Sequence, residues 1–291
     1  MHPSIPHSEI RIPHLYYDSH NHLQFPELAS HLDDIVADLR AIGLARAVVN
    51  GSAESDWPDI AALARRYDFV LPSFGLHPWD AGNRSPRWLD TLRATLDAHP
   101  RAPVGEIGLD RWMLDSARPD DERLAGLRRA PIEEQTEIFR AQLALAAERN
   151  LAASIHCVDA HGVLLDALET TPLPARGFLL HAYSGSAEML PRFVKLGAYF
   201  SFNGYFLAER KQRQRDTFLR VPLDRLLVET DAPAIPPPKK YRLRELPAPY
   251  HLLNHPANIA ATYAALAELR GVPLEKLTAV VAENFARLFG R

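Results

Sequence analysis

Two histidines stand two residues apart directly after a short apolar run near the N-terminus. The segment reads Asp18-Ser19-His20-Asn21-His22. Because successive side chains of a strand point to opposite faces, residues two apart share a face, so both imidazoles are expected on one side. Imidazole nitrogen is a common protein ligand of divalent metal ions. The pair therefore predicts one arm of a metal site.

Further apolar runs along the chain end in residues of the same chemical kind. These residues are Glu106, His156, His181 and Asp231. Taken singly, a histidine at a strand end is usually a hydrogen-bonded rim residue, and a carboxylate there often caps the next helix. Burying six titratable groups around one small volume is costly, however, unless a cation pairs with them. The complete set favours bound divalent metal ions over a purely structural role.

Six candidate ligands are more than one tetrahedral zinc ion with an open position requires. We therefore predict two divalent ions, and the donor types suit zinc, manganese, magnesium or nickel. We assign Glu106 as the bridge, with His20, His22 and Asp231 on one ion and His156 and His181 on the other. Such a pair of ions activates water for hydrolysis at a phosphorus or carbonyl centre. Glu106 and Asp231 are the predicted catalytic residues, and Asp231 would hold that water or accept its proton.

The elements that position these residues follow a repeated alternation of short apolar runs and longer segments of helical period. Strands are predicted over 15–20, 46–50, 69–74, 102–107, 152–156, 177–181, 198–202 and 225–229, and helices over 27–42, 56–66, 86–98, 133–149, 160–170, 186–196, 207–219, 256–270 and 273–288. Such an alternation over roughly 250 residues predicts an α/β fold, a closed (β/α)₈ TIM barrel, with a doubly wound open sheet as the alternative. The metal site would then lie at the C-terminal face of the strands. We expect an N-terminal extension over 1–15 and one hydrolase domain over 16–291.

Bulk composition limits the classes of protein to consider. The chain has 291 residues, 47% of them hydrophobic, a formal net charge of -3 and one cysteine, Cys157. A single cysteine cannot form an intrachain disulfide, which favours a reducing compartment. Neither a signal peptide nor a run of about 18 apolar residues is visible, so we expect a cytoplasmic protein without a membrane partner. The sequence does not indicate an oligomeric state.

Several motifs in a fixed order resemble the TatD family of metal-dependent deoxyribonucleases, in the amidohydrolase superfamily. The motifs are DSHNHL (18–23), GLHPW (75–79), VGEIGLD (104–110), SIHCVDA (154–160), LLHAYSGS (179–186), LLVETDAP (226–233) and ENFARLFG (283–290). The resemblance covers nearly the whole chain beyond about residue 15. It implies a deoxyribonuclease that cleaves DNA phosphodiester bonds from an end, with metal ligands at the same six positions named above.

The resemblance also implies a substrate site. His77 corresponds to a family histidine near the substrate phosphate. Independently, Ser184 and Gly185 follow His181 and offer backbone amides to an anionic group at the start of the next helix. His77, Ser184 and Gly185 are the predicted substrate-binding residues, with DNA or another phosphoester as the substrate.

The sequence leaves open the roles of two acidic residues near the candidate ligands. Asp110 lies four residues beyond Glu106, where it would either support a histidine or cap a loop. Glu229 lies two residues before Asp231, where it would either orient a histidine or pack beneath the site.

Departures from the family pattern keep other functions open. Val158 occupies the place of a family arginine that would bind phosphate bidentately. The segment 111–132 is longer than expected, and the basic cluster 210–215 is either a solvated helix face or a guide for a phosphate backbone. The alternatives are an amidohydrolase-type enzyme acting on a small amide, ester or phosphoester, and a non-catalytic metal-binding scaffold.

Overall fold

The computed structural model describes residues 14–290 of the chain, so the predicted extension over 1–15 lies mostly outside the described residues. Its strands are β1 (Tyr16–Asn21), β2 (Leu44–Asn50), β3 (Val70–Ser73), β4 (Val104–Asp110), β5 (Ala153–Val158), β6 (Phe178–Leu180), β7 (Ala198–Asn203) and β8 (Leu226–Glu229). All neighbouring strands pair in parallel and in sequence order, as β1-β2-β3 and as β4-β5-β6-β7-β8. Parallel neighbours require a crossover, and a helix supplies it at each step.

Backbone hydrogen bonds at two seams close these strands into a barrel. Between β3 and β4, Phe74 N donates to Pro103 O over 3.1 Å and Gly105 N donates to Phe74 O over 3.0 Å. Between the ends of β8 and β1, Asp231 N donates to His20 O over 2.9 Å. The first seam is tight, because a Cβ added to Gly75 would lie 2.8 Å from the carbonyl carbon of Gly105. The predicted (β/α)₈ barrel is confirmed.

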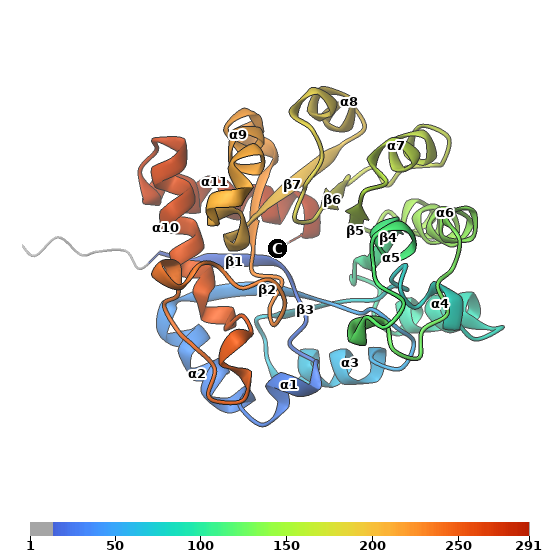
Figure 1. Ribbon diagram of the computed structural model, residues 1–291, viewed down its shortest axis with the longest axis horizontal. Helices are drawn as coiled ribbons and strands as arrows, with labels where there is room; N and C mark the ends of the chain where they lie inside the picture. Colours follow the sequence, from blue (N-terminus) through green and yellow to red (C-terminus); the bar gives the residue numbers. More distant parts are fainter. Residues whose placement is uncertain (1–13, 291) are drawn as a thin grey trace, which may run out of the picture.

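Helices surround the strands and cover their outer faces (Figure 1). They are α1 (Pro26–Ala29), α2 (Leu32–Ile42), α3 (Trp57–Arg66), α4 (Trp88–Ala98), α5 (Trp112–Asp115), α6 (Ile132–Glu148), α7 (His161–Glu169), α8 (Leu190–Lys195), α9 (Gln212–Arg220), α10 (Ile259–Arg270) and α11 (Leu274–Phe289). The helix predicted over 27–42 is two helices, because the chain turns at Ser30 and His31. The segment 232–255 contains only short 3-10 turns, at Lys239–Tyr241 and Tyr250–Leu252.

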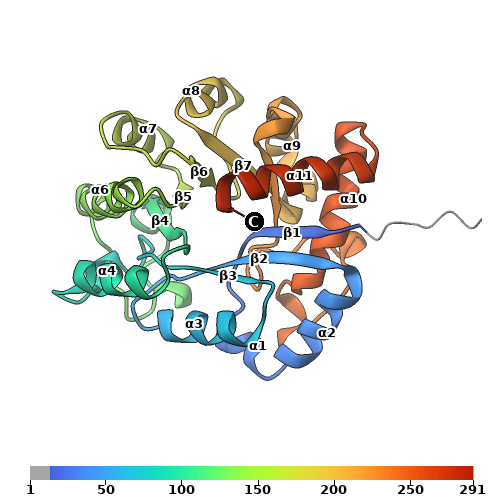
Figure 2. The same ribbon diagram turned by 180° about the vertical axis from the view of Figure 1, so that it is seen from behind.

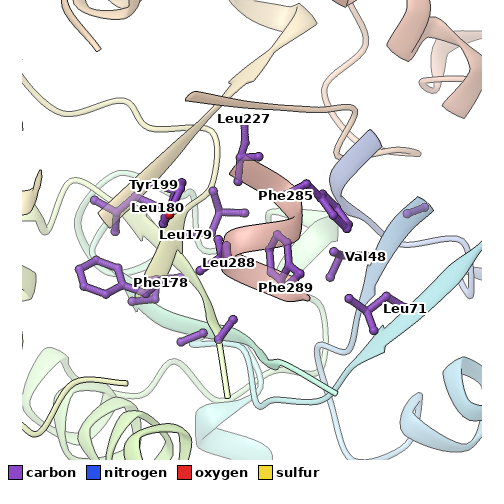
Figure 3. Packing of buried hydrophobic residues seen from close by; sticks show 14 of the residues in the cluster. Val48, Leu71, Phe178, Leu179, Leu180, Tyr199, Leu227, Phe285, Leu288 and Phe289 are labelled. Atoms are coloured by element: carbon purple, nitrogen blue, oxygen red, sulfur yellow. The ribbon is translucent and has the colours of Figure 1, made fainter. Parts of the chain in front are cut away.

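The last helix, α11, lies across the barrel at the end where the strands begin. Viewed from behind, it passes in front of the strands and brings the chain end to the middle of the barrel (Figure 2). Leu288 and Phe289 point among residues of the strands, including Leu71 and Leu227 (Figure 3). These apolar side chains belong to one continuous core, which closes this end of the barrel. The opposite end, where the strands finish, holds the polar cluster.

Among residues 14–290, none of the helices combines the length and apolar character needed to cross a membrane. Cys157, the only cysteine, is buried, and burial raises the pKa of its thiol. A buried thiol with a raised pKa behaves as a small apolar residue rather than as a nucleophile.

Candidate metal centre

The structure brings all six predicted ligands together at the C-terminal end of the barrel. His20 and His22 lie in and just after the last residues of β1, and Glu106 and His156 lie within β4 and β5. His181 directly follows β6, and Asp231 lies two residues after β8. Their side chains are largely buried, and the most accessible are those of His156 at 13% and Asp231 at 12%. The site is thus nearly enclosed, and its openings lie at these two groups.

Glu106 is at the centre of the cluster, because its two carboxylate oxygens face different pairs of imidazoles. Oε2 lies 3.2 Å from His20 Nε2 and 3.3 Å from His22 Nε2. Oε1 lies 2.9 Å from His156 Nδ1 and 2.8 Å from His181 Nε2. A carboxylate placed in this way can share its oxygens between two ions.

Asp231 adds a second carboxylate on the Oε2 side. Its Oδ1 lies 3.6 Å from His20 Nε2 and 3.4 Å from His22 Nε2. The residue has a φ of 54°, a left-handed conformation that costs a non-glycine residue on the order of 1–3 kcal/mol. The backbone bond from Asp231 N to His20 O helps hold it there, while His22 N donates to Ala232 O over 2.8 Å.

The spacing of the ring nitrogens provides a test of whether a metal ion fits. His20 Nε2 and His22 Nε2 are 3.3 Å apart, and His156 Nδ1 and His181 Nε2 are 3.2 Å apart. Two ligands about 2.0–2.1 Å from a tetrahedral ion are separated by about 3.3–3.4 Å. Each pair also faces one oxygen of Glu106. The donor types, their convergence and their spacing therefore fit one ion on each side of this carboxylate.

The ring nitrogens that point away from Glu106 have different partners on the two sides. On the Oε2 side, His20 Nδ1 lies 3.0 Å from Ser154 Oγ, and His22 Nδ1 lies 2.9 Å from the carbonyl oxygen of Asn50. Because a carbonyl oxygen only accepts, Nδ1 of His22 carries the hydrogen and leaves Nε2 free to bind a metal.

On the Oε1 side, both partners are carboxylates. His156 Nε2 lies 3.1 Å from Asp110 Oδ2, and His181 Nδ1 lies 3.6 Å from Glu229 Oε1. Both acids stand behind a histidine, as one of the two interpretations of the sequence expected. Only Asp110 is within hydrogen-bond distance, and within residues 14–290 His181 Nδ1 has no hydrogen-bond partner. A carboxylate behind a ligating histidine fixes its tautomer and makes the ring more basic.

Asp110 is itself held by several donors. Trp79 Nε1 donates to its Oδ2 over 2.6 Å, and the backbone N of Met113 donates to its Oδ1 over 3.0 Å. The Gln135 side chain brackets the Asp110 backbone, accepting from its N and donating to its O. These contacts also attach the segment that follows β4 to the rim of the metal centre.

Electrostatics in the cluster separate the carboxylates from the histidines. Burial raises the pKa of Glu106, but the charges of His181, His77 and His20 outweigh it and hold that pKa well below its usual range. Burial lowers the pKa of His22 and of His156. Hydrogen bonds that His22 donates to Asp231 and Glu106 nevertheless raise its pKa to about 10, and those that His156 donates to Asp110 and Glu106 raise its pKa to about 9. The metal-free site thus keeps protons that a metal ion would displace.

His77 lies against the same carboxylate, with Nε2 3.4 Å from Glu106 Oε1. The backbone N of Trp79 donates to His77 Nδ1 over 3.2 Å, so the ring hydrogen is on Nε2. Burial lowers the pKa of His77, which favours the neutral ring. A neutral imidazole in this state donates one hydrogen bond from Nε2 toward the centre.

Ser184 and Gly185 lie in the loop after β6, and within the described chain they form no hydrogen bond or ion pair with the six ligands. Gly185 is buried against Tyr183 and His161, and a Cβ there would lie 2.5 Å from the Tyr183 hydroxyl oxygen. Ser184 O accepts a hydrogen bond from Arg213 over 3.2 Å. The substrate-binding role of both residues stays a prediction. This hydrogen bond shows that Arg213, one residue of the basic cluster 210–215, lies beside the loop.

Several residues that support the site escaped the sequence analysis. Asp18 accepts hydrogen bonds from the backbone and the side chain of Thr230 and so ties the end of β8 to β1. Ser201 donates to Glu229 and thereby fixes the acid behind His181. Asp18 lies two residues before His20 and so shares its strand face. This spacing was the one sequence pattern that could have identified Asp18 as a supporting residue. Ser154 and Ser201 are ordinary small strand residues, and only the closed barrel reveals their contacts.

A profile of TatD related DNases matches residues 17–290. The chain belongs to the TatD related DNase family. Curated TatD relatives include a 3'-5' ssDNA/RNA exonuclease TatD from Salmonella typhimurium, 30% identical with 94% of this chain and 98% of the relative covered. Another is the uncharacterized metal-dependent hydrolase YabD of Bacillus subtilis, 28% identical over 94% of this chain and 99% of the relative.

A solved TatD homologue has the same architecture. The crystal structure of YjjV from Escherichia coli superposes with a TM-score of 0.80 at 28% identity, covering 95% of this chain and 98% of that one. The predicted family is thereby confirmed, and the protein is a TatD-type metal-dependent hydrolase.

Proposed function

We propose that the protein is a two-metal exonuclease that hydrolyses phosphodiester bonds at an end of single-stranded DNA. The observation that carries this proposal is the placement of Glu106, whose two oxygens face two separate pairs of imidazoles. Relatives named as 3'-5' ssDNA/RNA exonucleases support the substrate and suggest attack from the 3' end.

The residues that would hold the two ions follow from the two sides of Glu106. His20, His22 and Asp231 would hold one ion, His156 and His181 the other, and Glu106 would bridge them. When bound, the ions supply Lewis acidity, which polarises the phosphoryl group and lowers the pKa of water. Zinc, manganese, magnesium and nickel all remain compatible with this donor set.

Asp231 and His77 have the positions for acid–base and electrostatic roles. Burial raises the pKa of Asp231, but its hydrogen bond to His22 and the neighbouring histidines outweigh this and lower it, so the carboxylate is ionised. An ionised, partly accessible carboxylate can orient the attacking water and accept its proton. His77 would donate its Nε2 hydrogen to a non-bridging phosphate oxygen, where negative charge grows during the reaction.

Binding of the nucleic-acid backbone would fall to the rim of the site. Val158 stands where a family arginine would contribute a phosphate-binding cation. Arg213, exposed beside Ser184, would supply another cation at the next loop. The backbone amides of Ser184 and Gly185 would add hydrogen bonds to the same anionic group. The buried, unpaired thiol of Cys157 is consistent with a reducing cytoplasm as the place of action.

The deciding experiment is an assay of the metal-reconstituted protein on single-stranded DNA labelled at the 5' or the 3' end. We expect stepwise shortening from one end, and its loss in Asp231→Asn. Turnover of amide or ester substrates without cleavage of DNA would instead support an amidohydrolase acting on small molecules. Full metal occupancy without turnover of any substrate would show a metal-binding scaffold.

A further inference from the structure

A second cavity, far from the metal ligands in the fold, opens at the N-terminal end of the barrel. Its volume is about 630 Å³, within the range of roughly 300–1,000 Å³ typical of small-molecule sites. Residues that line it stand at or before the starts of strands, among them Arg46 in β2, Pro103 before β4 and Arg176 before β6. Phe289, at the end of α11, forms part of its wall. The metal ligands lie at the opposite ends of these strands.

Positive charge dominates this cavity. Three arginines line it, Arg46, Arg101 and Arg176, against the single carboxylate of Asp68. Within residues 14–290, none of the three lies within 4.0 Å of a carboxylate oxygen. Many other arginines of the chain do form such ion pairs, for example Arg84 with Glu134 and Arg149 with Asp97. The cavity thus holds three arginines without an ion-pair partner within the described chain.

One of these arginines has a buried donor without an acceptor. Arg46 Nε is out of contact with solvent and has no hydrogen-bond partner among residues 14–290. A buried donor left unpaired costs about 1–3 kcal/mol, and an anionic ligand would satisfy it. Guanidinium groups suit phosphate, because their fork of N–H donors matches two oxygens at once.

Apolar side chains form another part of the wall, and they favour a ligand that also has an apolar group. Leu71, Pro103, Leu151 and Phe289 line the cavity beside the arginines. Cationic and apolar surfaces in one cavity fit a small molecule that carries both a phosphate group and an apolar body. We infer that this cavity is a binding site for a small organic phosphate monoester, separate from the metal centre and independent of the proposed nuclease activity.

The test uses the metal-loaded protein with phenyl phosphate as the probe and phenol and inorganic phosphate as its two halves. We expect phenyl phosphate to raise the melting temperature and to bind in calorimetry more tightly than either half. The double variant Arg101→Gln/Arg176→Gln should weaken that binding by at least about tenfold, because it removes two charged donors. Both side chains are exposed, so the variant is expected to fold.

A matched control separates this site from general charge effects and from the metal centre. Arg40 is also exposed and unpaired within the described chain but does not line the cavity, so Arg40→Gln should bind phenyl phosphate as the wild type does. Nuclease activity should be unchanged in all of these variants, because none touches the metal ligands. The proposed function and this inference therefore fail independently.

Two results would overturn the inference. The first is the absence of any binding of phenyl phosphate, and the second is binding that the double variant leaves undiminished. Arg46→Met provides a further check, because it removes the buried donor and should weaken binding even where both exposed arginines remain.

Discussion

The two sides of Glu106 hold similar pairs of imidazoles but support them differently. On the Oε2 side, the histidines are backed by neutral oxygens, the Ser154 hydroxyl and the Asn50 carbonyl. On the Oε1 side, they are backed by the carboxylates of Asp110 and Glu229. The Oε2 side in turn has Asp231 among its direct neighbours.

This difference suggests a division of labour between the two positions. A carboxylate behind an imidazole makes it a stronger ligand, so under the proposed two-ion assignment the Oε1 side would retain its ion more firmly. On the Oε2 side, the negative charge is on a partly accessible group that faces the centre, where it would act on water. From this difference we propose that one position serves to hold a metal ion and the other to carry out the chemistry.

The largest effect is expected from Glu106→Gln, which removes the charge shared by both sides. Catalysis should fall by more than about 10⁴-fold, because the two ions lose their common ligand. Calorimetric titration should then detect fewer than two ions or weakened binding of both. A variant that still bound two ions with undiminished affinity would refute the bridging role.

Asp231→Asn should separate chemistry from metal retention. We expect kcat to fall by about 10²–10³-fold, because the carboxylate that accepts a proton from water is gone. Metal on the Oε1 side should stay bound, as measured by elemental analysis after dialysis. Asp224→Asn, an exposed acid before β8, is the matched control and should leave kcat unchanged. Equal losses in both variants would rule out a specific role for Asp231.

Asp110→Asn tests the carboxylate support of the Oε1 side. Metal affinity there should fall by about 10–100-fold, because His156 loses its charged partner. Ser154→Ala, which removes the neutral partner of His20, should have a smaller effect on the Oε2 side. Competition with a chelator measures both affinities. If the serine variant lost more affinity than the aspartate variant, the proposed difference between the sides would be wrong.

The smallest effect concerns pH and has opposite signs with and without metal. Metal binding displaces protons from His22 and His156. The affinity of the protein for metal ions should therefore rise about tenfold per pH unit for each proton released, up to pH about 9–10. In the metal-free protein these two pKa values exceed the ordinary histidine value of 6.5, so protonated His22 and His156 stabilise the folded protein fully below pH 6.5. This contribution to folding stability is lost as pH rises through about 9 and 10. Melting curves with and without chelator would show both trends, and parallel curves would contradict them.

Much of this architecture was predictable because both periodicity and strand ends are local properties. Apolar runs predicted the positions of all eight strands, and a parallel barrel brings the C-terminal ends of its strands to one face. Ligands separated by up to two hundred residues could therefore be grouped without any coordinates. Element boundaries were less predictable, as the break between α1 and α2 shows, because the turn at Ser30 and His31 depends on tertiary packing.

The sequence by itself determined the barrel, the six candidate ligands and the family, because residue type, alternation and motif order suffice for these. Tertiary structure alone decided that the two oxygens of Glu106 face different histidines and that Asp110 and Glu229 stand behind only one pair. It also revealed the arginine cavity, since Arg46, Arg101 and Arg176 are far apart in the chain. These features depend on distances of a few ångströms between side chains from different strands, and barrel closure sets those distances.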